Sequence, residues 1–439
     1  MLINYSFSNF RSFKNRTSLS MLAGTQTTMN ENLIRQDGYR IIPSVVIYGA
    51  NASGKSNIIM SLAVMKEIIL AGSLESNVPN LNNLEMCPFA HSDDKKAMSF
   101  EIEFTNKGYH LIYGFEVLCS LFKKDVRRIL SENLSIVDNK SKKSNQVKLF
   151  ARNSDGVIIM KDKEALNIIE FDEKLLGEFE KKINSNLDDT ELFLSRAFKS
   201  TINNELAEAV IDFFKDELVV VSDFTLKKAN LTFSLEDLPN KDFFAWNKIL
   251  EGFVKIADFG PQSIAFKSNK SDNEKSADME LVSIYRYKDK NAVVIPAELM
   301  ESRGTLKLLD FAIPFESLFS SGGVFVLDEF DAAIHPELIK GIIALFNDQT
   351  INKNGAQLIF TTHNPIYLNN KIFRRDQIRF VEKDQDTFES VIYSLADFGS
   401  KEIRNDHNYL INYFKGNYGA LPFIDFSKLL SKSASEEEE

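Results

Sequence analysis

The sequence predicts a mixed α/β fold in which a parallel-sheet core carries an added antiparallel sheet and an inserted helical segment. Two continuous apolar runs, 324–327 and 358–360, have the pattern of strands buried on both faces of a parallel sheet. Alternating apolar side chains on both sides of residues 106–108 predict an antiparallel hairpin. Between 162 and 255 the apolar residues recur at three- and four-residue steps, which indicates helices.

The chain, at 439 residues, is too long for one simple core, so we expect several lobes. The division we expect is an N-terminal lobe at 1–160, a helical insertion at 161–256, a C-terminal lobe at 257–430 and an acidic tail at 431–439. The tail ends in four glutamates, which predicts disorder. Residues 267–280 are strongly polar and are predicted to form a mobile loop.

Other elements follow from local periodicity. The start of the chain alternates apolar and polar residues, which predicts a strand rather than a signal peptide, and the next such run is its expected hairpin partner. Strands are expected at 1–7, 17–21, 129–137, 281–287 and 292–295, and apolar helical faces at 206–214 and 243–253.

Composition and charge narrow the classes of protein. A hydrophobic fraction of 44% is typical of a packed globular protein, and 36 phenylalanines predict a largely aromatic core. Cys87 and Cys119 fit neither a metal-site spacing nor a disulfide framework, which favours the reducing cytoplasm. No apolar run reaches about 18 residues, so we expect no membrane span. The net charge of −10 does not favour non-specific nucleic-acid binding, but it does not exclude a local basic groove.

Residues 49–56 match the phosphate-binding pattern G-x-x-x-x-G-K-[ST] at every fixed position, between an apolar run and a helical pattern. Two glycines let successive backbone N–H groups curl around a triphosphate, and the positive end of the helix points at the same place. Lys55 would reach the β- and γ-phosphates, and the Ser56 hydroxyl would hold Mg²⁺. The alternative is a Gly/Ser turn with a chance lysine. The residues expected to bind ATP here are Gly49, Ala50, Asn51, Ala52, Ser53, Gly54, Lys55, Ser56 and Asn57.

Two polar segments follow buried strands of the C-terminal lobe. Asp328 and Glu329 come directly after the run 324–327, and ligands of open α/β sheets lie beyond the carboxyl ends of the strands. Asp328 would hold Mg²⁺ through its hydration shell, and Glu329 would orient and deprotonate the attacking water. A strand that merely ends in an acidic turn is the alternative. His363 follows the next buried strand and could donate to a γ-phosphate and sense its loss.

Two further sites are weaker signals. Ser302, Gly304 and Thr305 open a predicted helix whose N-terminus could bind an anion, although Ser-x-Gly before a helix is also an ordinary cap. His335 could line an opposing subunit or only cap the helix that follows it.

Together these elements resemble the ABC-type ATPases of the SMC and RecF kind. The matching order is Asn9-Phe10-Arg11-Ser12-Phe13, the P-loop, the helix start at 302–305, the acidic pair, the segment 331–335 and His363. The roughly 270 residues between P-loop and acidic strand are also typical of that class. Three later segments look like the RloA, AbiL and AriA group of bacterial defence ATPases: 381–384, Tyr393-Ser394-Leu395 and Tyr418-Gly419-Ala420.

The resemblance implies an ABC-type P-loop NTPase head, with Arg11 as a further nucleotide contact. Two heads would close face to face, each ATP held between one P-loop and residues 302–305 of the other, and hydrolysis would reopen them. ATP would then shift a dimer equilibrium through its higher affinity for the closed form. Members of the group act with a separate effector in phage defence. The implied partners are therefore a second copy and an effector, expected to be a nuclease encoded nearby, in abortive infection.

Two other functions stay open. A DNA-repair ATPase that clamps duplex ends would need a basic face, for which the candidate cluster is Lys123, Lys124, Arg127 and Arg128, although a solvated strand edge is the simpler interpretation. A nuclease of the overcoming-lysogenization type would place three carboxylates around a metal, here Glu382, Asp384 and Asp386. The flanking runs favour a hairpin turn instead, and the about 75 residues after His363 are too few for that nuclease domain.

Overall fold

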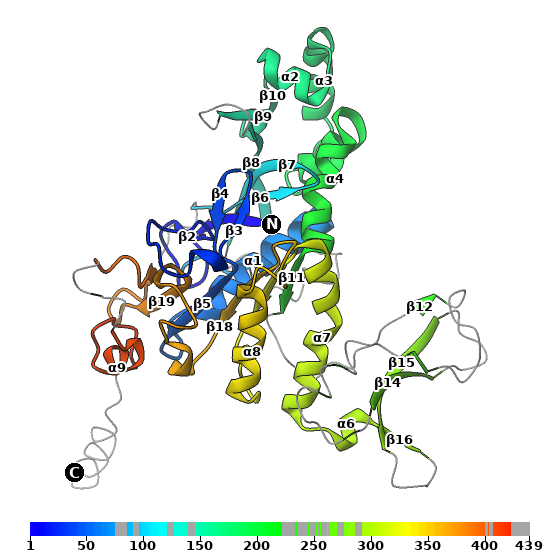
Figure 1. Ribbon diagram of the computed structural model, residues 1–439. Coiled ribbons are helices and arrows are strands. Elements are labelled where there is room, and N and C mark those ends of the chain that lie inside the picture. Colours follow the sequence, from blue (N-terminus) through cyan, green and yellow to red (C-terminus); the bar gives the residue numbers. More distant parts are fainter. Residues whose placement is uncertain are drawn as a thin grey trace, which may run out of the picture.

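The computed structural model describes residues 1–74, 86–90, 96–120, 127–138, 145–221, 263–269, 276–285, 292–399 and 407–422, with isolated positions between 233 and 261 and at 403. Within these residues the strands form a seven-stranded, a six-stranded, a five-stranded and a two-stranded sheet. Helices cover the larger sheets (Figure 1). The predicted α/β fold class is confirmed. No described helix combines the length and the apolarity that crossing a membrane requires.

The seven-stranded sheet is antiparallel throughout. Its order is β10 (Gly156–Ile159), β9 (Asn145–Asn153), β8 (Arg127–Asp138), β7 (Tyr109–Cys119), β6 (Met98–Asn106), β1 (Leu2–Ser8) and β2 (Thr17–Ser20). The predicted first strand, its hairpin partner and the later hairpin are confirmed. Lys107 and Gly108 join β6 to β7 with φ angles of 49° and 79°, the left-handed pair that a two-residue hairpin turn needs. The small ribbon of β3 (Ile34–Gln36) and β4 (Tyr39–Ile41) precedes the core.

The six-stranded sheet is the parallel core. Its order is β11 (Leu218–Val221), β17 (Val324–Leu327), β18 (Gln357–Thr361), β5 (Ser44–Gly49), β19 (Ile378–Lys383) and β20 (Ser390–Ser394), and only β20 runs antiparallel to its neighbour. Successive side chains of β5 enter two different cores, Val45 and Ile47 on one face, Val46 and Tyr48 on the other. This burial on both faces is why the central strands are uniformly apolar in sequence.

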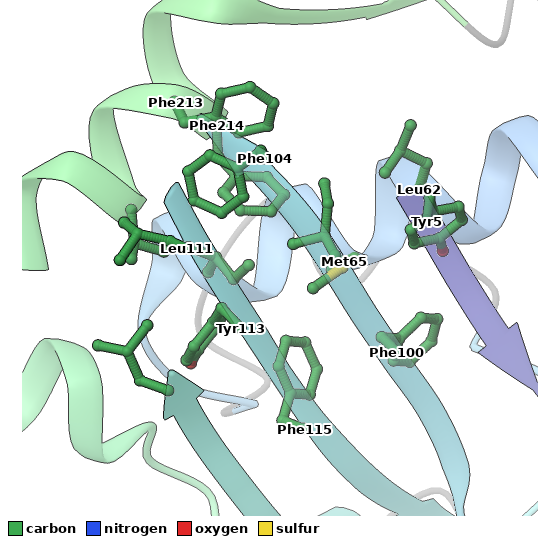
Figure 2. Close-up of a cluster of buried hydrophobic side chains, with 14 of the residues drawn as sticks. Tyr5, Leu62, Met65, Phe100, Phe104, Leu111, Tyr113, Phe115, Phe213 and Phe214 are labelled. Atoms are coloured by element: carbon green, nitrogen blue, oxygen red, sulfur yellow. The ribbon is translucent and has the colours of Figure 1, made fainter. Parts of the chain in front are cut away.

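Helix α1 (Lys55–Ala71) is packed into the core that joins the two large sheets. Figure 2 shows Leu62 and Met65 of this helix among side chains of the seven-stranded sheet. In the same cluster the rings of Phe104 and Phe213 stack with their centroids 4.2 Å apart. The prediction of an aromatic core is confirmed in this cluster. The P-loop helix is therefore fixed by a large apolar surface behind it.

The opposite face of the parallel sheet is covered by α7 (Arg303–Ser321), α8 (Pro336–Asn347) and α9 (Tyr409–Phe414). Phe311 of α7 meets Phe325 of β17 with ring centroids 5.7 Å apart. Phe319 of α7 and Phe346 of α8 lie 4.8 Å apart, so these two helices are neighbours (Figure 1). The helix start at 302–305 and the acidic pair are consequently held by one apolar core.

The helical insertion contains α2 (Lys163–Ile169), α3 (Leu176–Asn184), α4 (Asn204–Asp212) and the wider helical turns Leu194–Ile202 and Phe213–Glu217. Helical structure is thus confirmed over much of 163–217. Buried Glu132 of β8 anchors it by accepting hydrogen bonds from the N–H groups of Phe193 and Leu194.

The helical prediction is wrong at 218–221, 233–234 and 244–245, which are strands. The β-branched run 219–221 lies in strand β11, which joins the parallel sheet beside β17. Where a helix was expected over 243–253, Phe244–Ala245 form β13, and most of the other residues of that stretch lie outside the described part of the chain. The lobe boundaries remain predictions.

The five-stranded sheet projects from the body of the molecule (Figure 1). It contains β12 (Phe233–Ser234), β13, β14 (Ser263–Asn269), β15 (Ser276–Tyr285) and β16 (Val293–Pro296), which is followed by α6 (Ala297–Met300). The predicted mobile loop 267–280 is wrong at both ends, because these residues pair across β14 and β15. Lys267 lies opposite Glu280, and such opposite charges stabilise a polar ribbon that lacks the usual apolar alternation. The acidic tail 431–439 lies outside the described residues.

Candidate nucleotide-binding site

The P-loop joins β5 to α1 by a tight left-handed turn. Ala52 and Gly54 have φ angles of 60° and 114°. A Cβ on Gly54 would lie 2.7 Å from Ser390 Oγ and 2.8 Å from Ser12 Oγ, so the position accepts only glycine without strain. The turn leaves the first N–H groups of α1 without partners inside the helix. Ser56 at this helix start is exposed, so the N-terminus of α1 is accessible to a phosphate group.

Three residues that are far apart in sequence meet beside this loop. Lys55 Nζ donates to the carbonyl oxygens of Gly49 at 2.9 Å and Ala50 at 3.0 Å, and lies 3.5 Å from His363 Nδ1. His363 Nε2 lies 3.6 Å from Glu329 Oε1. Lys55, His363 and Glu329 therefore form one line of contacts, as their predicted roles around a single nucleotide require.

The electrostatics of this line favour a neutral imidazole. Burial lowers the pKa of Lys55 to about 8, against the opposing effect of Asp328 and Glu329, so the ammonium is still charged at pH 7. Burial, and then the charge of Lys55, lower the pKa of His363 below 6.5. A lysine ammonium only donates, so His363 Nδ1 must accept and Nε2 carries the proton. That proton is on the nitrogen that lies 3.6 Å from Glu329 Oε1.

Thr361, for which no motif predicted a role, holds the acidic pair. Its hydroxyl donates to Asp328 Oδ1 at 2.5 Å and accepts the N–H of Glu329 at 2.7 Å. Glu329 has a left-handed φ of 45°, a conformation that persists in a non-glycine residue only when its surroundings hold it. The available signal was the place of Thr361 at the end of the strand next to β17, because parallel strands end at one edge of the sheet.

Ser56 and Asp328 are the residues that could hold Mg²⁺. Ser56 is exposed at the first turn of α1, and Asp328 presents its carboxylate at the end of β17. Within the described residues, no group of three His, Cys, Asp or Glu side chains is arranged to hold a metal ion unaided. Mg²⁺ commonly takes one or two protein oxygens and completes its shell with phosphate and water.

The predicted nucleotide contact Arg11 lies at the P-loop helix. Arg11 Nη1 is 3.5 Å from Asn57 Oδ1, and Asn57 Nδ2 donates to Ser12 Oγ at 2.8 Å. Arg11 has a left-handed φ of 49°, inside a turn that Phe10 and Phe13 close with two backbone hydrogen bonds of 2.8 Å. Arg11 and Asn57 are therefore brought together beside the phosphate-binding loop.

The helix start at 302–305 and His335 both make caps. Ser302 Oγ accepts the N–H of Thr305 at 3.1 Å and so begins α7. His335 Nδ1 accepts the N–H of Glu337 at 3.3 Å and begins α8. Gly304 packs so closely on the carbonyl of Ala333 that a Cβ would overlap its oxygen. Contact of either segment with a second copy stays a prediction.

The three carboxylates considered for a nuclease belong to the β19–β20 hairpin, as the flanking runs predicted. Asp384 Oδ1 accepts the N–H groups of Asp386 at 3.0 Å and Thr387 at 2.7 Å, which closes the turn. Glu382 Oε1 instead accepts the N–H of Ala420.

The three C-terminal segments that carried the narrower resemblance are in contact. Tyr393 donates its hydroxyl to the carbonyl of Tyr418 at 2.8 Å, and Ala420 binds Glu382 of β19. Of the predicted basic cluster, Lys123 and Lys124 lie outside the described residues, while Arg127 and Arg128 begin β8.

Comparison with known proteins places this site in a family. Residues 44–369 match the family model described as "AAA domain, putative AbiEii toxin, Type IV TA system". The chain belongs to this AAA-domain family. The matched range contains the P-loop, the acidic pair and His363, so the family membership covers the site described above. No curated protein matches the sequence.

Two solved structures are distantly similar to this AAA-domain protein. The SmcHead bound to the C-winged helix domain of ScpA is 16% identical, with a TM-score of 0.39, over 92% of this chain and 99% of that chain. The Smc head domain with an extended coiled coil, bound to the C-terminal domain of ScpA derived from Pyrococcus furiosus, is 14% identical, with a TM-score of 0.36, over 90% and 96%. The predicted α/β fold with an antiparallel sheet and helices inserted after it is present in the described residues, and the ABC-type assignment stays a prediction. Membership in the RloA, AbiL and AriA group stays a prediction.

Proposed function

We propose that this AAA-domain protein hydrolyses ATP with Mg²⁺, and that nucleotide-driven pairing of two copies controls a separate effector protein. The observation that carries the proposal is the line of contacts from Lys55 through His363 to Glu329. A cation, a proton donor and a carboxylate base are the three groups that cleavage of a terminal phosphate needs.

In the proposed reaction, Lys55 and the N–H groups of the P-loop bind the β- and γ-phosphates. Ser56 and Asp328 would hold Mg²⁺, which neutralises phosphate charge. Glu329 takes a proton from a water molecule whose oxygen bonds to the γ-phosphorus, while the bond to the β,γ-bridging oxygen breaks and its electron pair leaves with ADP. His363 donates its Nε2 hydrogen to a γ-phosphate oxygen and neutralises part of the charge that develops there.

Pairing of two copies is supported by the exposed start of α7. Ser302 and Arg303 are exposed at a helix N-terminus, which favours an anion. In the proposal they contact the γ-phosphate held by the P-loop of the second copy, and His335 lies on the adjoining exposed turn. ATP would hold the pair closed because it contacts both copies, and hydrolysis would remove that contact.

The setting of the proposal comes from the family description, which names a putative AbiEii toxin and a Type IV TA system. We propose the same kind of setting for this chain, abortive infection against phage, with a nuclease encoded nearby as the effector. Affinity purification of the tagged chain from its native host would test this, with expected co-purification of that neighbour. Recovery of the chain without it, in both ATP and ADP, would contradict the effector proposal.

Sedimentation velocity tests the pairing. With Mg²⁺ and ATP, Glu329→Gln is expected to shift from the 49.9 kDa single-chain mass to twice that mass, because it binds ATP without cleaving it. Lys55→Ala is the matched control and is expected to stay at the single-chain mass. An unchanged mass of Glu329→Gln at saturating ATP would contradict pairing.

A further inference from the structure

Lys307 is a buried lysine in the second turn of α7, with only 8% of its surface exposed. Its Nζ donates to the carbonyl oxygen of Glu329 at 2.6 Å and lies 3.3 Å from that of Ala332. Burial lowers its pKa to about 8, so the ammonium is charged at pH 7. A positive charge from α7 thus binds the backbone of the turn that carries the catalytic carboxylate.

Local preferences do not explain a lysine at this position. A cation near a helix N-terminus is opposed by the helix dipole, and burial of an ammonium costs free energy unless it is well paired. A residue that conflicts with its local environment is expected mainly at a functional or strained site. The strained segment here is the turn 329–333, since Glu329 and Ala333 have left-handed φ angles of 45° and 66°.

The turn is held from two directions. On the sheet side, the Thr361 hydroxyl accepts the N–H of Glu329 at 2.7 Å. On the helix side, Lys307 binds the Glu329 carbonyl, which also accepts the N–H of Ala332 at 3.1 Å. The backbone on both sides of the Glu329 side chain is therefore fixed, and Lys307 adds a charged donor to its carbonyl oxygen.

The same helix carries the segment proposed to meet the second copy. Gly304 is one turn before Lys307 and lies directly against the carbonyl of Ala333, with no room for a Cβ. Backbone contact at Gly304 and charge contact at Lys307 therefore join the start of α7 to both ends of the turn 329–333. The start of α7 and the backbone of Glu329 are thus in direct contact through these two residues.

We propose that Lys307 is a positioning residue that couples contact of residues 302–305 with the second copy's ATP to the orientation of Glu329 in its own site. Each site would then be set for hydrolysis only when the two heads have closed. The inference rests on the proposed function and adds to it a route between the two nucleotides.

The test is Lys307→Met, which removes the ammonium and keeps most of the side-chain length. Loss of a charge-assisted hydrogen bond that orients the base is expected to lower kcat about 10- to 100-fold. The dissociation constant for ATP should change by less than about twofold, because the P-loop is untouched. Lys66→Met is the matched control, since Lys66 is also partly buried and Nζ donates to the carbonyl of Leu218 at 2.5 Å, away from the catalytic turn. Its kcat is expected to stay within about threefold of the wild-type value.

A double-mutant cycle separates positioning from general damage. If Lys307 acts through Glu329, adding Lys307→Met to Glu329→Gln lowers the residual rate by less than about twofold. Gly304→Ala displaces Ala333 and leaves the Lys307 side chain in place. Adding it to Glu329→Gln should likewise lower the residual rate by less than about twofold. This variant replaces Lys307→Met in the cycle if Lys307→Met does not fold.

The outcomes are distinct. A wild-type kcat in Lys307→Met, or losses that multiply in the double variant, would overturn this inference and leave the proposed function standing. A wild-type protein that neither hydrolyses ATP nor pairs would overturn both.

Discussion

Replacing Thr361 by valine tests how the acidic pair is held. Thr361 is fully buried, and valine keeps its shape while removing the hydroxyl. The change deletes the hydrogen bond to Asp328 Oδ1 and the one from the N–H of Glu329. It leaves the buried carboxylate of Asp328 and the backbone N–H of Glu329 without this partner.

The magnitude follows from those two bonds. A hydrogen bond to a charged group contributes about 1.5–3 kcal/mol and a neutral one about 0.5–1.5 kcal/mol, so about 3 kcal/mol is a central value for the pair. If half of this is expressed in the transition state, kcat falls about tenfold, since about 1.4 kcal/mol corresponds to a factor of ten. The remainder would lower the stability of the fold.

The assay is phosphate release at saturating ATP over a range of Mg²⁺ concentrations. Thr361→Val is expected to show the lower kcat together with a higher half-saturating Mg²⁺ concentration, because Asp328 is less well oriented. Thr361→Ser keeps the hydroxyl and should stay near the wild-type values. Equal kcat and equal Mg²⁺ dependence in Thr361→Val and wild type would refute this reasoning.

Gly54→Ala is expected to weaken ATP binding about tenfold or more, because the residue has a φ of 114° and a Cβ would crowd Ser390. Calorimetric titration measures this affinity, and an unchanged value would contradict the packing around Gly54. Because the pKa of His363 is lowered, the acidic limb of the kcat pH profile is expected below 6.5, and a limb centred at or above 6.5 would count against that assignment. Arg374→Met removes the guanidinium that binds buried Asp376 at 2.9 Å and leaves that carboxylate with the N–H of Gly24 and the nearby charge of Arg379. Denaturant unfolding at pH 7 should show a loss of about 3–5 kcal/mol, and a loss below about 1 kcal/mol would contradict the pairing.

The central strands and the P-loop could be predicted because their signals are local. Strand β17 is an uninterrupted apolar run, and the P-loop is a fixed pattern between a strand and a helix. Strands β14 and β15 could not be predicted in full, since their pairing depends on opposed polar residues such as Lys267 and Glu280 rather than on apolar alternation.

The supporting residues of the site depend on tertiary contacts that no local pattern encodes. Thr361 and Glu329 are 32 residues apart, and they meet because β17 and β18 are adjacent and parallel. Lys307 reaches Glu329 only through the packing of α7 on the sheet. Its place at the unfavourable end of a helix was the single sequence signal that marked it.

The most direct test of the central claim measures ATP binding and phosphate release on the same preparations of wild type, Lys55→Ala and Glu329→Gln. The account predicts that wild type binds and hydrolyses Mg-ATP. Lys55→Ala is expected to lose binding, and Glu329→Gln to bind as wild type does while phosphate release falls by about a hundredfold or more. Undiminished phosphate release by Glu329→Gln would show that the carboxylate beside Lys55 and His363 is not the base, and would contradict the account.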